Sequence, residues 1–439
     1  MYPTHILPNG LRIICSPNRS AVTHVGVYIN VGSRDETGAE EGIAHFIEHS
    51  IFKGTEHRRS YHIRNRIDGV GGELDAFTSK EETCVFASVL SQHLERALEL
   101  FADILFHSTF PEHEIEKEKD VVIEEIDLYR DTPTELIYDD FEERFFGSHP
   151  LAHNILGTKR NVRRFTPDML RDFMRAHYTP DRMVVSAVGN IDFPHLVRLC
   201  EKYFLNENEN ENQNENGNGS RPTLNSQLSI LNSQFSRPNS QFSTEGRRPP
   251  VEPTLNSQFN STVSRRTHQV HLLIGGAAPT LFGEQKTAFT LLNNILGGPA
   301  MNSRLNVAVR EKQGFCYTIE SQYVPFTDAG LFYIYAGVDA GTADRSTDLI
   351  LAELRRLRDI PLSTQQLHAA QQQLIGQMAI NNDLALNEMQ SIGKAFLNFD
   401  HVDTLEEMSR DILAVTAADL QSVAQQYLDE ASLSRLYYK

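Results

Sequence analysis

The sequence has no tryptophan and only four cysteines among its 439 residues. The cysteines are scattered and form no Cys-x-x-Cys pair: Cys15, Cys84, Cys200 and Cys316. This spacing argues against a disulfide framework or a thiolate metal site and favours a reducing compartment. A run of about 18 apolar residues is also missing, so no transmembrane helix is expected. Because the first residues carry no basic and apolar leader, we expect a cytoplasmic protein.

Positive charge is scarce as well. Lys and Arg number 41 against 58 Asp and Glu, which gives a formal net charge of −17 at pH 7. Nucleic-acid binding requires basic patches, so this balance argues against it. An acidic protein is compatible with attracting basic peptides into a cavity.

Against this background, three ionisable residues stand in an apolar stretch. Residues 42–52 read as a helix that is apolar on nearly every side, and such helices are normally buried. His45, Glu48 and His49 share one face of it, at positions i, i+3 and i+4. A bound cation would offset the cost of burying them. The spacing is His-x-x-Glu-His, the inverted zincin motif, although a pair of core histidines satisfied by neighbours is the alternative.

A second acidic cluster lies in residues 112–126. At about 100° per residue, four apolar side chains form one narrow helical stripe: Ile115, Val122, Ile126 and Tyr129. Glu118 and Glu125 flank this stripe on the same side, whereas Glu124 points toward solvent. Glu125 can therefore reach a buried site and Glu124 cannot. A plain charged helix with a solvated face is the alternative, and it accounts for Glu124 better than for Glu118 or Glu125.

The two clusters together suit a catalytic zinc ion, which takes three protein ligands and keeps one position open for water. His45 and His49 supply two imidazoles and Glu125 a carboxylate. Glu48 faces the open position in this arrangement and acts as a general base on the bound water. Glu118 is expected to orient a ligand or the water by a hydrogen bond.

The residues around the motif resemble one enzyme family. Residues 41–49 and 52–55, with flanking residues 7–11 at the first strand and 31–36 before the helix, resemble the M16 (pitrilysin) metallopeptidases, and most closely their short bacterial branch. Residues 296–298, 303–305 and 310–317 match the second half of the family. The resemblance implies one Zn²⁺ per chain, bound by His45, His49 and Glu125, with Glu48 and Glu118 as catalytic residues.

The same resemblance implies a substrate site. Arg310 and Tyr317 match the pair that binds the substrate backbone and stabilises the oxyanion; alternatively, Arg310 pairs on its own helix and Tyr317 packs in a strand. Asp75 and Ala76 lie in residues 71–79, which match the edge strand that pairs with substrate. Asp75 replaces the usual asparagine and lacks its amide donor.

The chain also repeats itself. Thr166, Leu170 and a following strand recur near the end as Thr416, Leu420 and a closing strand. We therefore predict an α+β protein of two homologous halves, each a mainly antiparallel sheet packed with helices, joined by a flexible linker into a clamshell. The predicted parts are a zinc-binding half, a disordered low-complexity linker and a non-catalytic half that closes over substrate: residues 1–205, 206–266 and 267–439.

These features predict a zinc metalloendopeptidase that cleaves short or unstructured peptides. The resemblance implies a homodimer or pairing with a related subunit. Two alternatives stay open: a catalytically idle partner or scaffold subunit, and a peptide-binding module with a structural zinc.

Overall fold

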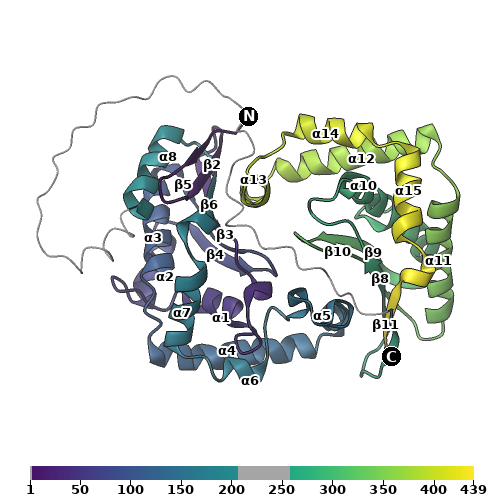
Figure 1. Cartoon of the computed structure of the whole chain (residues 1–439), viewed down its shortest axis with the longest axis horizontal. Coiled ribbons are helices and arrows are strands. Elements are labelled where there is room, and N and C mark those ends of the chain that lie inside the picture. Colours follow the sequence, from purple (N-terminus) through teal and green to yellow (C-terminus); the bar gives the residue numbers. More distant parts are fainter. Residues whose placement is uncertain (1, 206–257) are drawn as a thin grey trace, which may run out of the picture.

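Two β-sheets organise the structure, a computed structural model that describes residues 2–205 and 258–439 (Figure 1). The first sheet has the strand order β1-β2-β6-β3-β5-β4. Its neighbours pair antiparallel except for β2 and β6, which are parallel. The strands are β1 (Thr4–Ile6), β2 (Arg12–Pro17), β3 (Val22–Ile29), β4 (Glu73–Thr78), β5 (Thr83–Leu90) and β6 (Met183–Gly189).

The second sheet has the order β7-β11-β8-β10-β9. Only β7 and β11 are parallel in it. The strands are β7 (Asn260–Val263), β8 (Val270–Ala277), β9 (Cys316–Pro325), β10 (Gly330–Val338) and β11 (Ser434–Tyr438). Strand for strand, this order and its directions repeat β2-β6-β3-β5-β4, so the predicted α+β fold of two homologous halves is confirmed.

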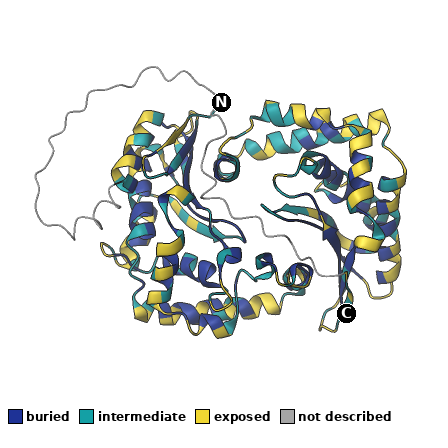
Figure 2. Cartoon of the chain, in the orientation of Figure 1, coloured by how far each residue is buried: buried dark blue, intermediate teal, exposed yellow. Residues whose placement is uncertain are grey.

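Helices cover one face of each sheet and bury an apolar core against it. The first half has α1 (Ile43–Ser50), α2 (Ser60–Asp68), α3 (Leu94–Phe106), α4 (Glu112–Arg130), α5 (Pro133–Phe146), α6 (Lys159–Val162), α7 (Pro167–His177) and α8 (Phe193–Cys200). The second half has α10 (Lys286–Gly297), α11 (Ala343–Asp359), α12 (Thr364–Asn382), α13 (Ala385–Phe399), α14 (Leu405–Ala414) and α15 (Ala417–Tyr427). Figure 2 shows that the central strands of both sheets are buried, whereas the edge strands and the outward faces of the helices carry exposed residues.

The repeated threonines begin equivalent helices. The Thr166 side chain accepts a hydrogen bond from Met169 N at the start of α7, and the Thr416 side chain accepts one from Asp419 N at the start of α15. Each threonine satisfies an N–H group that has no partner within the helix. The strand that follows, β6 or β11, then lies between the other strands of its sheet.

Each half lends one helix to the sheet of the other half. Helix α13 packs on β2, β3 and β6, and α5 packs on β8 and β11. The close approach of α13 requires Gly393, because a Cβ atom there would lie 2.7 Å from the Tyr28 ring. Both helices bury apolar side chains in mixed clusters of the two halves, so the halves share their cores.

Two boundary predictions need correction. Residues 260–263 fall in the predicted linker, yet they form β7 and pair with β11. The linker prediction is therefore wrong for these residues, and its part from 206 to 257 lies outside the described residues. Residues 7–11, expected to open the first strand, form the turn between β1 and β2. Among the described helices, none is long and apolar enough to cross a membrane.

Candidate metal centre

The motif helix α1 is held in place by burial and by an unusual cap. Ile43, Ala44, Phe46 and Ile47 are fully buried in the first core. Its N-cap residue, Gly42, has no side chain to bind the first N–H groups. The carboxylate of Glu36 does so instead, because Gly42 N and Ala44 N each donate to it at 2.8 Å.

Helix α4 lies beside α1 and brings Glu125 to the two histidines. Glu125 Oε2 is 3.4 Å from His49 Nε2 and 3.8 Å from His45 Nε2. One ligand atom from each of the three residues lies within 4.8 Å of the others. Glu124, the neighbouring residue, is exposed, so Glu125 and not Glu124 faces the site.

These three residues fit a zinc ion. Nitrogen and oxygen ligands lie about 2.0–2.2 Å from zinc at tetrahedral angles, so they are roughly 3.3–3.5 Å from one another. The two measured separations from Glu125 are close to this value. Glu125 Oε2 is also buried and has no hydrogen-bond partner, an arrangement that is costly unless a ligand satisfies the atom.

Glu48 lies on the same helix face between β4 and the histidines. Burial raises the pKa of its carboxyl group; the carboxylates of Glu125 and Asp75 add to this, whereas Thr78 and His49 lower it. A carboxylate whose pKa is raised toward neutrality is a more effective proton acceptor at neutral pH. Glu48 is thus a partly buried carboxyl group with a raised pKa on the helix face that carries the two histidines.

A chain of polar contacts fixes the orientation of His49. Its Nδ1 lies 3.0 Å from Glu118 Oε1, which leaves Nε2 for the metal. Lys53 binds the other oxygen of Glu118. The sequence predicted the role of Glu118 but gave none to Lys53. Lys53 was visible only as part of residues 52–55, which resemble the family motif.

The carboxylates also set the charge of the histidines. Burial lowers the pKa of His49, but the hydrogen bond to Glu118 and the nearby carboxylate of Glu125 outweigh this and raise it to about 9. Burial and the neighbouring His49 lower the pKa of His45. In the metal-free protein at neutral pH, His49 is therefore protonated and His45 is neutral.

Asp75 and Ala76 lie on β4, which is an edge strand. Asp75 is exposed, and its Oδ1 accepts a hydrogen bond from Ala76 N at 2.8 Å. The aspartate side chain therefore occupies a backbone donor at the edge of the sheet. A peptide that pairs with β4 at this residue must displace it.

Arg310 and Tyr317 lie together but away from the histidines. Arg310 Cζ is 5.7 Å from the centre of the Tyr317 ring, and the tyrosine is 80% exposed. Arg310 Nη1 also donates to Asn306 Oδ1 at 3.4 Å. Strand β9 begins at Cys316 and ends at Pro325 beside the first half. Tyr317 thus stands at the other end of the strand, roughly 26 Å from that contact, and no contact given for the described residues joins the pair to the ligand cluster.

A second group of possible ligands among the described residues is His401, Asp403 and Glu407. His401 and Asp403 are exposed. Glu407 accepts hydrogen bonds from Thr404 N and Oγ1 in the capping box of α14, in which Thr404 is the N-cap residue. This group serves the helix terminus and gives no reason to expect a metal.

Comparisons with known proteins give matches to two family models and to several relatives. The model of the family described as Insulinase (Peptidase family M16) matches residues 12–159, and that of the Peptidase M16 inactive domain matches residues 164–374. An uncharacterized zinc protease of Bacillus subtilis is 32% identical over 98% of this chain and 96% of its own length. One of Streptomyces coelicolor is 33% identical over 96% of this chain and 86% of its own length.

Two solved structures have the same fold. A protease from Helicobacter pylori superposes with a TM-score of 0.84 at 21% identity, covering 100% of this chain and 99% of its own. A peptidase M16 inactive domain from Pseudomonas fluorescens has a TM-score of 0.82 at 19% identity, covering 100% of this chain and 97% of its own.

Proposed function

The chain belongs to peptidase family M16, and from this premise we propose that it is a zinc-dependent endopeptidase. The observation that carries the proposal is the meeting of His45, His49 and Glu125 at ligand distances, with Glu48 beside them. The two relatives named above are called zinc proteases, which supports zinc as the metal. The open fourth position of such a site is what distinguishes catalytic from structural zinc.

Each residue then has a defined task. Zinc held by His45, His49 and Glu125 would lower the pKa of a bound water and polarise the substrate carbonyl. Glu48 accepts a proton from the attacking water and later delivers it to the leaving amine. Glu118 holds His49 through Nδ1, and Lys53 holds Glu118.

Substrate binding follows from the edge strand. A peptide that adds to β4 as a further strand runs past Glu48, and its backbone pairs with Ala76 once Asp75 releases that N–H. Pairing through the backbone suits short or unstructured peptides, because folded segments have no free strand to offer.

Arg310 and Tyr317 provide donors for the developing oxyanion in this proposal. Their distance from the ligand cluster within one chain favours action from a second copy. In a homodimer the pair of one chain would serve the zinc site of the other.

Peptide turnover with and without a chelator tests the proposal. Endopeptidase activity that disappears with the chelator and returns with added zinc is expected. A chain that retains zinc and cleaves no peptide from a random pool, alone or with related subunits, would instead be an idle partner or a binding module.

A further inference from the structure

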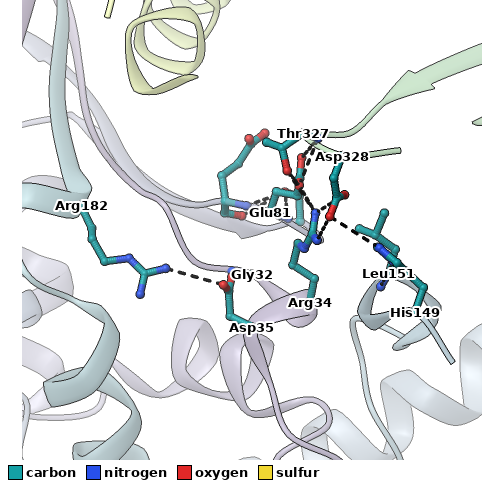
Figure 3. Close-up of polar contacts among 11 residues, drawn as sticks. Gly32, Arg34, Asp35, Glu81, His149, Leu151, Arg182, Thr327 and Asp328 are labelled. Carbon is teal, nitrogen blue, oxygen red and sulfur yellow. Dashed lines mark hydrogen bonds and ion pairs between the residues drawn. The ribbon is translucent and has the colours of Figure 1, made fainter. Parts of the chain in front are cut away.

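The turn between β9 and β10 reaches across to the zinc-binding half. Arg34 Nη1 donates to Asp328 Oδ1 at 2.9 Å, and Nη2 donates to Oδ2 at 2.6 Å (Figure 3). Arg34 Nη1 also lies 2.5 Å from Glu81 Oε1 in the turn between β4 and β5. Thr327 N and Oγ1 donate to Glu81 as well. We call Arg34, Glu81, Thr327 and Asp328 the junction.

The junction is closed to solvent. Arg34 is only 5% exposed, and the side chain of Asp328 is 6% exposed. Without Asp328, the buried guanidinium of Arg34 would keep Glu81 as the remaining carboxylate of the junction, and breaking a buried ion pair is destabilising. Thr327 and Asp328 of the second half therefore help to hold the side chain of Arg34.

The backbone around Arg34 has little freedom to move by itself. Ser33 N and Arg34 N donate to Ser79 O and Lys80 O at 3.2 and 3.0 Å. Asp35 Oδ2 accepts from Gly32 N at 2.9 Å. A Cβ atom at Gly32 would lie 2.4 Å from Ser79 O, so only glycine permits this approach. A displacement of Arg34 would consequently also move its neighbours in residues 32–36.

Two residues further on, Glu36 caps the zinc helix. It is 5% exposed, and both its oxygens accept N–H groups from residues 42 and 44. Because α1 has only eight residues, a large share of its N-terminal N–H groups depends on this one side chain.

We infer that Arg34 and Glu36 are positioning residues that make the zinc helix depend on contact with the second half. The junction holds the side chain of Arg34, residues 32–36 link Arg34 to Glu36, and Glu36 caps the start of α1. Helix α1 carries His45, Glu48 and His49. The second half thereby tunes the metal site from Asp328 and Thr327, without contributing a ligand. The effect on turnover rests on the proposed function, whereas the effect on α1 does not.

Hydrogen exchange on the full chain tests the coupling. Asp328→Asn keeps the shape of the side chain and removes its charge. Amides in residues 42–50 should then exchange faster, together with those of residues 326–330. Asp400→Asn is the matched control, since Asp400 forms another ion pair between the halves, with Arg12 at 2.7 Å, and has the positive φ that asparagine tolerates. It should leave residues 42–50 unchanged.

Zinc affinity and kinetics complete the test. Asp328→Asn should weaken zinc binding by up to about tenfold, the lower end for a lost outer partner of a metal ligand, and lower kcat more than it changes KM. Faster exchange at 326–330 with unchanged exchange at 42–50 and unchanged zinc affinity would overturn the inference. If Asp328→Asn does not fold, Thr327→Val takes its place, because it removes only the hydroxyl hydrogen bonds to Glu81 and Arg34. Amide exchange at residues 42–50 and zinc affinity then decide in the same way.

Discussion

The two halves of the molecule share one sheet plan and differ in the side chains placed on it. Helices α1 and α4 of the first half carry two histidines and the acidic residues of the metal centre. In the second half, α10 contains no histidine, aspartate or glutamate, and α12 contains one histidine, His368, which is exposed. The same scaffold therefore brings possible zinc ligands together on α1 and α4 of one half, whereas α10 and α12 of the other half carry no such set. Chemistry here depends on a few residues and not on the fold.

The second half is nevertheless more than a lid. Its helix α13 packs on the first sheet, and helix α5 of the first half packs on the second sheet. It also supplies Asp328 to the junction and carries Arg310 and Tyr317 on an exposed edge. The comparison thus separates a half that carries the candidate zinc ligands from a half for which we propose positioning and substrate-binding roles.

The largest effect should follow from removing a metal ligand in the first half. Glu125→Gln replaces a charged ligand with a neutral one, so zinc affinity should fall by at least about 100-fold, beyond the cost of losing an outer partner. Glu124→Gln, one residue away and exposed, should change neither zinc content nor turnover. Metal analysis of the two purified variants decides, and zinc loss in Glu124→Gln alone would show that the helix face is misassigned.

Tyr317→Phe tests what the second half contributes to the reaction. Losing one oxyanion donor costs on the order of 100-fold in turnover, while zinc content should stay unchanged. Wild-type turnover in this variant would reduce Tyr317 to a packing residue.

Co-expression of Glu48→Gln chains with Tyr317→Phe chains then asks whether the pair acts between copies. If it does, a mixed dimer keeps one intact site, formed by Glu48 of one chain and Tyr317 of the other. Activity should therefore return in the purified mixed dimer. If both residues act within one chain, the mixed dimer stays inactive.

The pH dependence of zinc affinity should arise from His49 in the first half. The pKa of His49 in the metal-free protein is about 9, so zinc must displace a proton below this pH. Affinity should fall about tenfold for each pH unit from 9 downward. In the metal-free protein this raised pKa stabilises the fold below about pH 6.5, and that contribution is lost as the pH rises through 9. Glu118→Gln removes one cause of the shift, so its dependence on pH should begin at a lower pH.

The smallest effect is expected at Asp75. Its carboxylate contributes to the raised pKa of Glu48, so Asp75→Asn should move the acidic limb of the pH profile to lower pH. Turnover at neutral pH should change by about twofold or less, because exposed charges interact weakly. A large loss of turnover would mean that the carboxylate itself holds substrate.

The helix face of each ligand was predictable because it is local, whereas the meeting of the two helices was expected from the need of zinc for a third ligand and from the family resemblance. His45, Glu48 and His49 share a helix face by spacing alone, and the stripe on α4 separates Glu125 from Glu124. The duplication was visible at Thr166 and Thr416, since each caps a helix before an equivalent strand.

Contacts between distant segments were not predictable. Strand β7 has a polar sequence next to a low-complexity segment and is defined by pairing with β11. Arg34 meets Asp328 across 294 residues of sequence, and no local pattern marks that pair. The packing of α5 and α13 on the sheet of the opposite half was not predictable either. Their sequence patterns give each helix an apolar face but do not say which sheet that face packs on.

Glu48→Gln tests the central claim most directly. The substitution leaves His45, His49 and Glu125 in place and removes the proton acceptor, since an amide cannot take the proton from water. Zinc content and peptide turnover are measured on the same purified sample, beside the wild-type protein. The account predicts wild-type zinc content with nearly all turnover lost. Full turnover with zinc bound would contradict it, because the reaction would then need no base at Glu48.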